Sequence, residues 1–222
     1  MVKFNLSIIA LICGSFTGLA LTPVVMKCLP RDGEFGHEIL AKSLRSQALS
    51  SGQLVNGSSS SKVLVVEFSD YLCDACRRSD PFLDSTLAEA PNISRVLVHF
   101  PFHDGARNGA IYALAGSKLG LGREIHLKMI SSPPSSWKQL FEILCKDKSP
   151  EQVKAALADA EVMLVRSNDL TKSLSIQATP KILIVGENDV VFEATSWYSG
   201  LEYLQYKKYL NKDVTGILKV FK

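Results

Sequence analysis

The stretch that decides the fold is KVLVVEFSDYLCDACRRSDPFL, residues 62–83, in which a strand-forming run gives way to a helix-forming run. Its first part, KVLVVEF, is a continuous apolar run of the kind that forms a central strand buried on both faces. Cys73 and Cys76 lie at the junction of the two runs. A disulfide that closes so short a loop restrains little chain entropy in the unfolded state. We therefore expect the two cysteines to serve chemistry rather than stability.

Length and charge limit the classes of function. The chain has 222 residues, of which 46% are hydrophobic, and this is enough for one domain with a core and an insertion or appendage. The net charge at pH 7 is +3, and the lysines and arginines are scattered along the sequence. Proteins that bind nucleic acid gather such residues on one helix or face. We therefore expect no nucleic-acid partner.

The N-terminus has the pattern of an export signal. Lys3 precedes an uncharged, mostly apolar run from Phe4 to Met26, with small residues at Gly18 and Ala20. This order predicts a signal peptide over residues 1–20 that is cleaved after Ala20. The alternative is an uncleaved anchor, because about 20 apolar residues can span a bilayer, and only then would the chain be attached to a membrane. In both cases the rest of the chain meets an oxidising compartment.

After this segment, strand and helix patterns alternate. Residues 21–61 are expected to form an N-terminal segment that ends in a Gly/Ser-rich linker, SSGQLVNGSSSSK. A helical stretch from Cys73 to about Ala90 is followed by a second apolar run, RVLVHF, which makes a strand–helix–strand unit. Residues 106–170 have helical periodicity throughout. KILIVG and VVFEA then predict an antiparallel hairpin, and a last helix is expected from Ser199.

Three motifs carry a resemblance to a known family. The first is EFSDYLCDAC, which places Glu67 six positions before the first cysteine, the second is Pro81, five positions after the second cysteine, and the third is IQATPKILIVG. With these motifs the chain resembles the DsbA-like exported thiol:disulfide oxidoreductases of the thioredoxin superfamily over residues 62–222.

The resemblance implies an α/β protein with a thioredoxin fold. An all-helical insertion is then expected between the βαβ half and the ββα half of that fold. The implied boundaries are 62–105 and 171–222 for the thioredoxin-like domain and 106–170 for the insertion.

The placement of the cysteines predicts disulfide exchange. The amino end of a helix favours an anionic thiolate, so Cys73 is the expected attacking cysteine. Cys76 lies one turn deeper, where it can resolve a mixed disulfide by attacking the Cys73 sulfur. The resemblance implies that Glu67 is the buried proton acceptor for Cys76. It also implies a cis bond between Thr179 and Pro180, set against the cysteines and leaving a backbone edge free to bind an extended substrate.

The dipeptide between the cysteines bears on redox strength. Strongly oxidising members of the family that the chain resembles have Pro-His there, and a histidine at the second position stabilises the attacking thiolate. Asp74 instead adds a negative charge next to Cys73, which disfavours the thiolate. Arg77 and Arg78 act in the opposite direction, but solvent and salt are expected to screen them. We therefore expect a weaker oxidant, whose role leans toward isomerisation or reduction of selected clients.

Two other interpretations of the cysteines compete with this one. Zinc could be bound by Cys73, Cys76, His99 and His103, although the gap is longer than in zinc fingers and Pro101 argues against a ligand-bearing helix. His126 lies in a helical stripe, where a packed role is expected. The second alternative is a thioredoxin-like chaperone or binding module without catalysis. Such a module usually lacks one of the two cysteines, and this chain has both.

The partners and cofactors follow from disulfide exchange. We expect exported client proteins and a membrane or periplasmic redox partner, with the periplasm as the compartment. No metal or organic cofactor is expected, because the disulfide between Cys73 and Cys76 itself carries the redox equivalent. Cys28 and Cys145 either form a structural disulfide or leave Cys145 as a small buried residue beside Leu144. The sequence favours neither.

Overall fold

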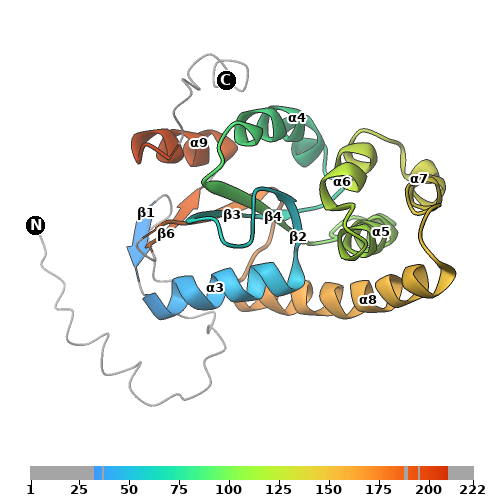
Figure 1. Cartoon of the computed structure of the whole chain (residues 1–222). Coiled ribbons are helices and arrows are strands. Elements are labelled where there is room, and N and C mark those ends of the chain that lie inside the picture. The colour runs from blue at the N-terminus through green and yellow to red at the C-terminus, as the bar shows by residue number, and fades with distance from the viewer. Residues whose placement is uncertain (1–32, 37, 188–189, 195, 210–222) are drawn as a thin grey trace, which may run out of the picture.

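The centre of the protein is a six-stranded sheet with the strand order β1-β6-β5-β3-β4-β2 (Figure 1). The computed structural model describes residues 33–36, 38–187, 190–194 and 196–209. β3 (Val63–Ser69) and β4 (Ile93–His99) are parallel, and the other neighbouring pairs are antiparallel. The mixed sheet and its helices confirm the predicted α/β class.

The strand–helix–strand unit forms as its hydrophobic pattern predicts. Every residue of β3 and of β4 is buried, because helices cover both faces of the sheet. α4 (Asp74–Ala88) connects the two strands and packs Leu83 and Leu87 against the sheet. The N-terminal end of α4 therefore lies at the C-terminal end of the central strand.

The predicted hairpin is also present. β5 (Lys181–Val185) and β6 (Val190–Ala194) are antiparallel, and β5 pairs with β3, so that the residues just before β5 lie near the C-terminal end of β3. α9 (Trp197–Tyr206) follows. It begins two residues before the predicted start at Ser199, because Ser196 is the N-cap and accepts a hydrogen bond from the Ser199 N–H at 3.2 Å.

Helices fill the stretch between these two halves. They are α5 (Ala106–Lys118), α6 (Gly122–Ile130), the short 3₁₀ helix η1 (Pro134–Ser136), α7 (Trp137–Leu144) and α8 (Pro150–Ser173). They enclose a core of their own around Trp137 and Ile125. α8 begins at a capping box formed by Ser149 and Gln152. It continues past residue 170, and Leu170 and Leu174 pack under the sheet.

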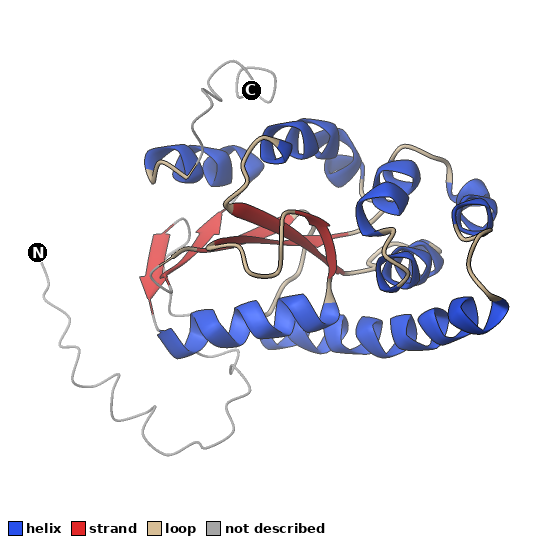
Figure 2. Cartoon of the chain, in the orientation of Figure 1, coloured by secondary structure: helices blue, strands red, loops and turns tan. Residues whose placement is uncertain are grey.

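Two helix layers cover the sheet (Figure 2). α3 (Glu38–Ser51) and the C-terminal part of α8 pack on one face, whereas α4 and α9 pack on the other. Successive residues of a strand point to opposite faces, so Val63 and Val65 of β3 join the core under α4 and α9. Glu67 has the same parity. Its side chain therefore lies on the α4 side of the sheet, where the cysteines are.

The structure corrects the prediction for residues 21–61. Within this range, β1 (Gly33–Gly36) pairs with β6, and β2 (Gln53–Asn56) pairs with β4, so the predicted segment and linker supply both edge strands. Backbone pairing with β4 holds residues 53–56 as a strand, and Gly57, at φ +74°, allows the turn that follows. The Gly/Ser-rich composition of this stretch does not predict β2, because β2 is stabilised by its pairing with β4.

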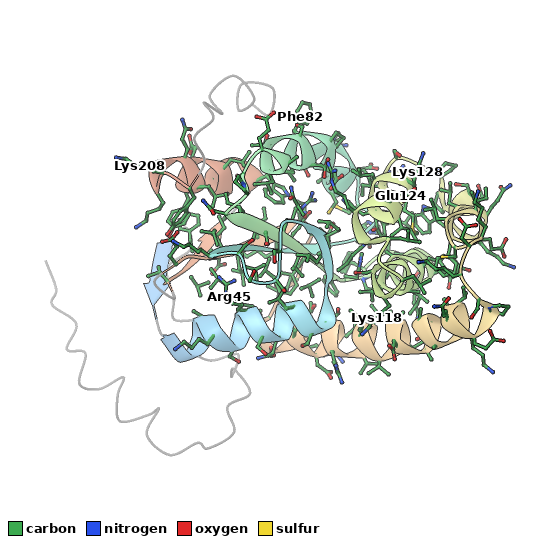
Figure 3. All side chains as sticks on the ribbon, viewed as in Figure 1. Arg45, Phe82, Lys118, Glu124, Lys128 and Lys208 are labelled. Carbon is green, nitrogen blue, oxygen red and sulfur yellow. The ribbon has the colours of Figure 1, made fainter. Side chains whose placement is uncertain are left out.

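The rest of the predicted linker is held against α3. Arg45 of α3 donates from its guanidinium to the carbonyls of Ser61, at 2.9 Å, and Lys62, at 2.8 Å. Figure 3 shows Arg45 between α3 and the sheet, among the side chains that fill this layer. Residues ahead of 62 thus pair and pack with the sheet and α3, and the domain boundary at residue 62 stays a prediction.

Some predictions fall on residues that the structure does not describe. The predicted signal peptide, residues 1–20, and Cys28 lie outside the described residues. Among the described helices, none combines the length and the apolar character that crossing a bilayer requires. Cys145 is a buried thiol at the end of α7, and burial raises its pKa. Whether it pairs with Cys28 stays a prediction.

Candidate redox-active site

Cys73 is the N-cap residue of α4, as the sequence predicts. Its backbone is extended, with φ −74° and ψ 116°, and its sulfur accepts a hydrogen bond from the backbone N–H of Cys76 at 3.5 Å. The Cys73 N–H donates to the Asp70 carbonyl at 3.0 Å, which closes the turn between β3 and α4. An anionic sulfur at this position is favoured by the free N–H groups and the dipole of the helix.

The two cysteines differ in burial. The exposed fraction is 7% for Cys73 and 1% for Cys76, so the N-cap sulfur is the outer one. Burial, together with the negative charge of Glu67, raises the pKa of the Cys76 thiol well above its usual value. Cys76 therefore needs a proton acceptor before it can attack as a thiolate.

The segment ahead of β5 completes the outer face of the site. The Thr179–Pro180 bond is cis, as predicted. The Cys73 thiol donates a hydrogen bond to the Thr179 carbonyl oxygen, with an S···O distance of 3.4 Å. The structure thus brings together the residues of the CxxC motif and the Thr-Pro motif, which lie over a hundred positions apart in the sequence.

A buried carboxylate fixes the turn that presents Cys73. Asp70 accepts hydrogen bonds from the Leu72 N–H at 2.8 Å, the Phe102 N–H at 2.9 Å and the His103 N–H at 2.9 Å. The His103 ring nitrogen Nδ1 contacts the same carboxylate at 2.8 Å. Asp70 therefore ties the cysteine turn to the loop that follows β4. Sequence reasoning missed this residue.

Glu67 is completely buried, which excludes an outward-facing role in the strand. Its oxygen Oε2 accepts hydrogen bonds from Arg95 of β4, at 2.9 Å from Nε and 2.6 Å from Nη2. Its other oxygen, Oε1, has no hydrogen-bond partner among the described residues. Burial raises the pKa of Glu67, although the Arg95 charge opposes the shift. A buried carboxyl group of raised pKa can exchange a proton with a neighbouring thiol.

The ion pair extends to residues that sequence reasoning missed. Arg95 Nη2 also donates to Asp80 of α4, and Asp80 Oδ1 contacts His126 Nε2 of α6 at 2.8 Å. His126 Nδ1 in turn contacts the Tyr71 hydroxyl at 3.1 Å. His126 is thus a member of a buried polar network rather than a merely packed residue. The available signal was the presence of Glu67 and Arg95 in two otherwise apolar strands.

The four residues of the zinc interpretation are bonded elsewhere. His99 Nε2 contacts Gln53 Oε1 at 2.9 Å, and burial lowers the pKa of His99 to about 3. His103 contacts Asp70. In the part of the chain that the structure describes, no group of three or more histidine, cysteine, aspartate or glutamate residues is arranged to hold a metal ion.

The fold and these contacts define a class of protein. A CxxC pair that opens a helix after the central strand, beside a cis-proline, is the arrangement of thioredoxin-fold proteins that exchange thiols and disulfides. Comparison with known proteins supports this class, although no family model matches the chain.

Three similar proteins are informative. Disulfide bond formation protein D of Bacillus subtilis is 26% identical over 185 residues, which are 74% of this chain and 78% of that protein. The catalytic domain of Proteus mirabilis ScsC matches with a TM-score of 0.58 at 21% identity, over 77% of this chain and 97% of that one. The thiol-disulfide exchange protein alpha-DsbA2 of Wolbachia pipientis matches with a TM-score of 0.56 at 20% identity, over 77% and 95%. The chain therefore has the thioredoxin-like fold of these structures, and its sequence is similar to a disulfide bond formation protein.

Proposed function

We propose that the chain is an exported thiol:disulfide oxidoreductase whose redox centre is Cys73-Asp74-Ala75-Cys76. The observation that carries the proposal is the N-cap position of Cys73, whose sulfur lies 3.5 Å from the Cys76 backbone nitrogen and 3.4 Å from the Thr179 carbonyl oxygen. The first contact favours a thiolate, and the second places a carbonyl edge beside the sulfur that clients would reach. We assign Thr179 and Pro180 to client binding on this basis.

The exchange in the reducing direction has two steps. The Cys73 thiolate attacks a client disulfide, forms a mixed disulfide and releases one client sulfur as a thiolate. Cys76 then gives its proton to Glu67 and attacks the Cys73 sulfur, which forms the Cys73–Cys76 disulfide and releases the second client thiolate. The client gains two electrons and the protein loses two. In the oxidising direction the steps run in reverse, and a membrane or periplasmic redox partner restores the starting state.

The position of Asp74 supports a preference among these directions. Its side chain is exposed in the first turn of α4, next to Cys73. A negative charge there disfavours the thiolate of the reduced protein and so stabilises the disulfide. We infer that the protein is a moderate oxidant that isomerises or reduces selected clients.

Alkylation and trapping test the roles of the two cysteines. In a variant with Cys28→Ala and Cys145→Ala, iodoacetamide near neutral pH should label Cys73 before Cys76, because Cys73 is the more exposed cysteine and caps the helix. Cys76→Ser should accumulate mixed disulfides with client proteins, whereas the matched variant Cys73→Ser should not. Equal labelling rates, or trapping only by Cys73→Ser, would contradict the assignment.

Export is a separate proposal, supported by the apolar run from Phe4 to Met26 behind Lys3. Protein recovered from the periplasmic fraction should begin at Leu21 when its N-terminus is sequenced. Protein that starts at Met1 and pellets with membranes would favour the uncleaved anchor, and protein found only in the cytoplasmic fraction would contradict export.

A further inference from the structure

The buried ion cluster behind the cysteines contains more groups than the exchange steps use. Glu67, Arg95, Asp80 and His126 are all buried, with exposed fractions of at most 1%. With two carboxylates, one guanidinium and a neutral imidazole, the cluster carries one net negative charge. An unbalanced charge in a protein interior is costly. One additional proton removes it.

Glu67 and His126 are the two groups that can hold this proton. Asp80 is excluded, because its hydrogen bond to His126 and the charge of Arg95 lower its pKa in spite of its burial. Burial raises the pKa of Glu67, which would favour the proton there. A proton on Glu67, however, would leave no carboxylate to accept the proton of Cys76.

The surroundings of His126 satisfy both of its protonation states. In the neutral state Nε2–H donates to Asp80, and the Tyr71 hydroxyl donates to Nδ1. In the charged state Nδ1–H donates to the Tyr71 oxygen, and the hydroxyl hydrogen turns to Gln53 Oε1, 3.2 Å away. The Gln53 amide is held in the required orientation, because its Nε2 donates to the Gly122 carbonyl at 2.7 Å. Rotation of one hydroxyl thus allows His126 to take up a proton without leaving a buried donor unpaired.

The titratable and charged groups around His126 come from the sheet, from the turn after β3 and from α4. They are Glu67 of β3, Tyr71 of the turn after β3, Asp80 of α4, and Arg95 and His99 of β4. His99 does not compete for the proton, because burial lowers its pKa to about 3. Burial raises the pKa of Tyr71, which keeps its hydroxyl hydrogen. This leaves Glu67 and His126 as the two positions for the balancing proton, and the contacts of His126 accommodate it by rotation of the Tyr71 hydroxyl.

We propose that His126 is a positioning residue for disulfide exchange: its ring carries the balancing proton while it donates to Asp80, and this leaves Glu67 a carboxylate that can accept the Cys76 proton. This inference rests on the proposed function. When the proton moves from Cys76 to Glu67, the cluster gains one positive charge opposite the new thiolate, so the pair is neutral. With His126 uncharged, the balancing proton already occupies Glu67, and the transfer has no acceptor.

The step that Cys76 performs can be timed with a chromogenic reagent. Reduced protein carrying Cys28→Ala and Cys145→Ala is mixed with one equivalent of the symmetrical disulfide of thionitrobenzoate. Attack by Cys73 releases the first thionitrobenzoate anion, and attack by Cys76 on the mixed disulfide releases the second. His126→Gln should slow the second release about tenfold near pH 7, because the balancing proton then occupies Glu67 and reduces its carboxylate fraction. The first release should change less than about twofold, and the difference in the second should shrink as the pH rises and Glu67 ionises.

A double-mutant cycle separates this role from a structural one. Glu67→Gln removes the acceptor, so adding His126→Gln to it should slow the second release no further. If the two effects add, if both releases slow equally, or if His126→Gln matches the parent protein at every pH, the inference is wrong. Should His126→Gln lose its near-ultraviolet circular dichroism, Tyr71→Phe decides: slower second release supports the inference, and an unchanged rate overturns it. A parent protein that releases only one equivalent would instead refute the proposed function.

Discussion

Replacement of Arg95 by methionine is expected to be among the most destabilising single changes in this protein. Arg95 is 1% exposed and donates to both Glu67 and Asp80, and its guanidinium also lies over the Trp197 ring at 5.4 Å. Methionine has a similar length but no charge, so the two buried carboxylates would lose the guanidinium that bridges them. Removing one partner of a buried ion pair typically costs about 3–5 kcal/mol. That is a large part of the roughly 5–15 kcal/mol by which a domain is stable.

The loss of unfolding free energy in Arg95→Met should depend on pH. The direction of this dependence follows from the number of protons that the folded and unfolded states bind. Without Arg95, the pKa of Glu67 in the folded state rises further above that of the unfolded chain, and the pKa of Asp80 is no longer lowered by the Arg95 charge. The folded state then binds more protons than the unfolded state, so its free energy of unfolding falls as the pH rises. In the wild type only Glu67 has a raised pKa, whereas that of Asp80 is lowered. Urea denaturation should therefore show a larger difference between wild type and Arg95→Met at about pH 8 than at about pH 5.

A surface ion pair supplies the matched control. Arg107 pairs with Glu161, and their side chains are 59% and 47% exposed, so Arg107→Met should cost no more than about 1 kcal/mol. If Arg95→Met costs no more than this control, Arg95 does not stabilise the two buried carboxylates. A loss that is the same at both pH values would show that they stay ionised without it.

The remaining predictions concern the first turn of α4. Asp74→Pro with Ala75→His should raise the reduction potential by some tens of millivolts, since about 30 mV corresponds to 1.4 kcal/mol of thiolate stabilisation; an unchanged potential in a glutathione equilibrium would show that the dipeptide does not set it. Arg77→Ala should lower the unfolding free energy by about 1.5–3 kcal/mol, because the Arg77 guanidinium donates hydrogen bonds to the carbonyls of Tyr71 and Ser132. Exposed Arg78 is the control, and Arg78→Ala should stay within about 0.5 kcal/mol of wild type; equal losses in urea denaturation would contradict the role of those contacts.

Most of the fold was predictable because its signals are local. The apolar runs of β3 and β4, the capping box at Ser149 and the turn between β5 and β6 each lie within a short window of sequence. The pairing of the cysteines with Thr179 and Pro180 was predictable for a different reason. It came from the resemblance to a family and not from spacing.

The edge strand and the ion cluster could not be predicted, because both depend on register. β2 has no apolar run of its own, and its pairing with β4 decides its structure. Arg95 and Asp80 meet Glu67 only after β3 and β4 align in parallel and α4 packs across them. A charged residue in each of two apolar strands indicates an ion pair, but the sequence does not show which face of the sheet each occupies.

The helical insertion contributes contacts to the candidate redox site as well as covering it. α6 supplies His126 to the Asp80 carboxylate, and the carbonyl of Ser132, just after α6, accepts hydrogen bonds from Arg77 one turn after Cys73. Tyr71, two residues before Cys73, belongs to the core of the insertion. The thioredoxin half thus supplies the cysteines and Glu67, whereas the insertion supplies partners for the groups around them. Because His126 is buried, removal of the insertion would deprive Asp80 and Tyr71 of their contacts with its ring, leaving only those with Arg95 and Gln53, and would expose a core. Fold and chemistry therefore depend on the same contacts at this junction.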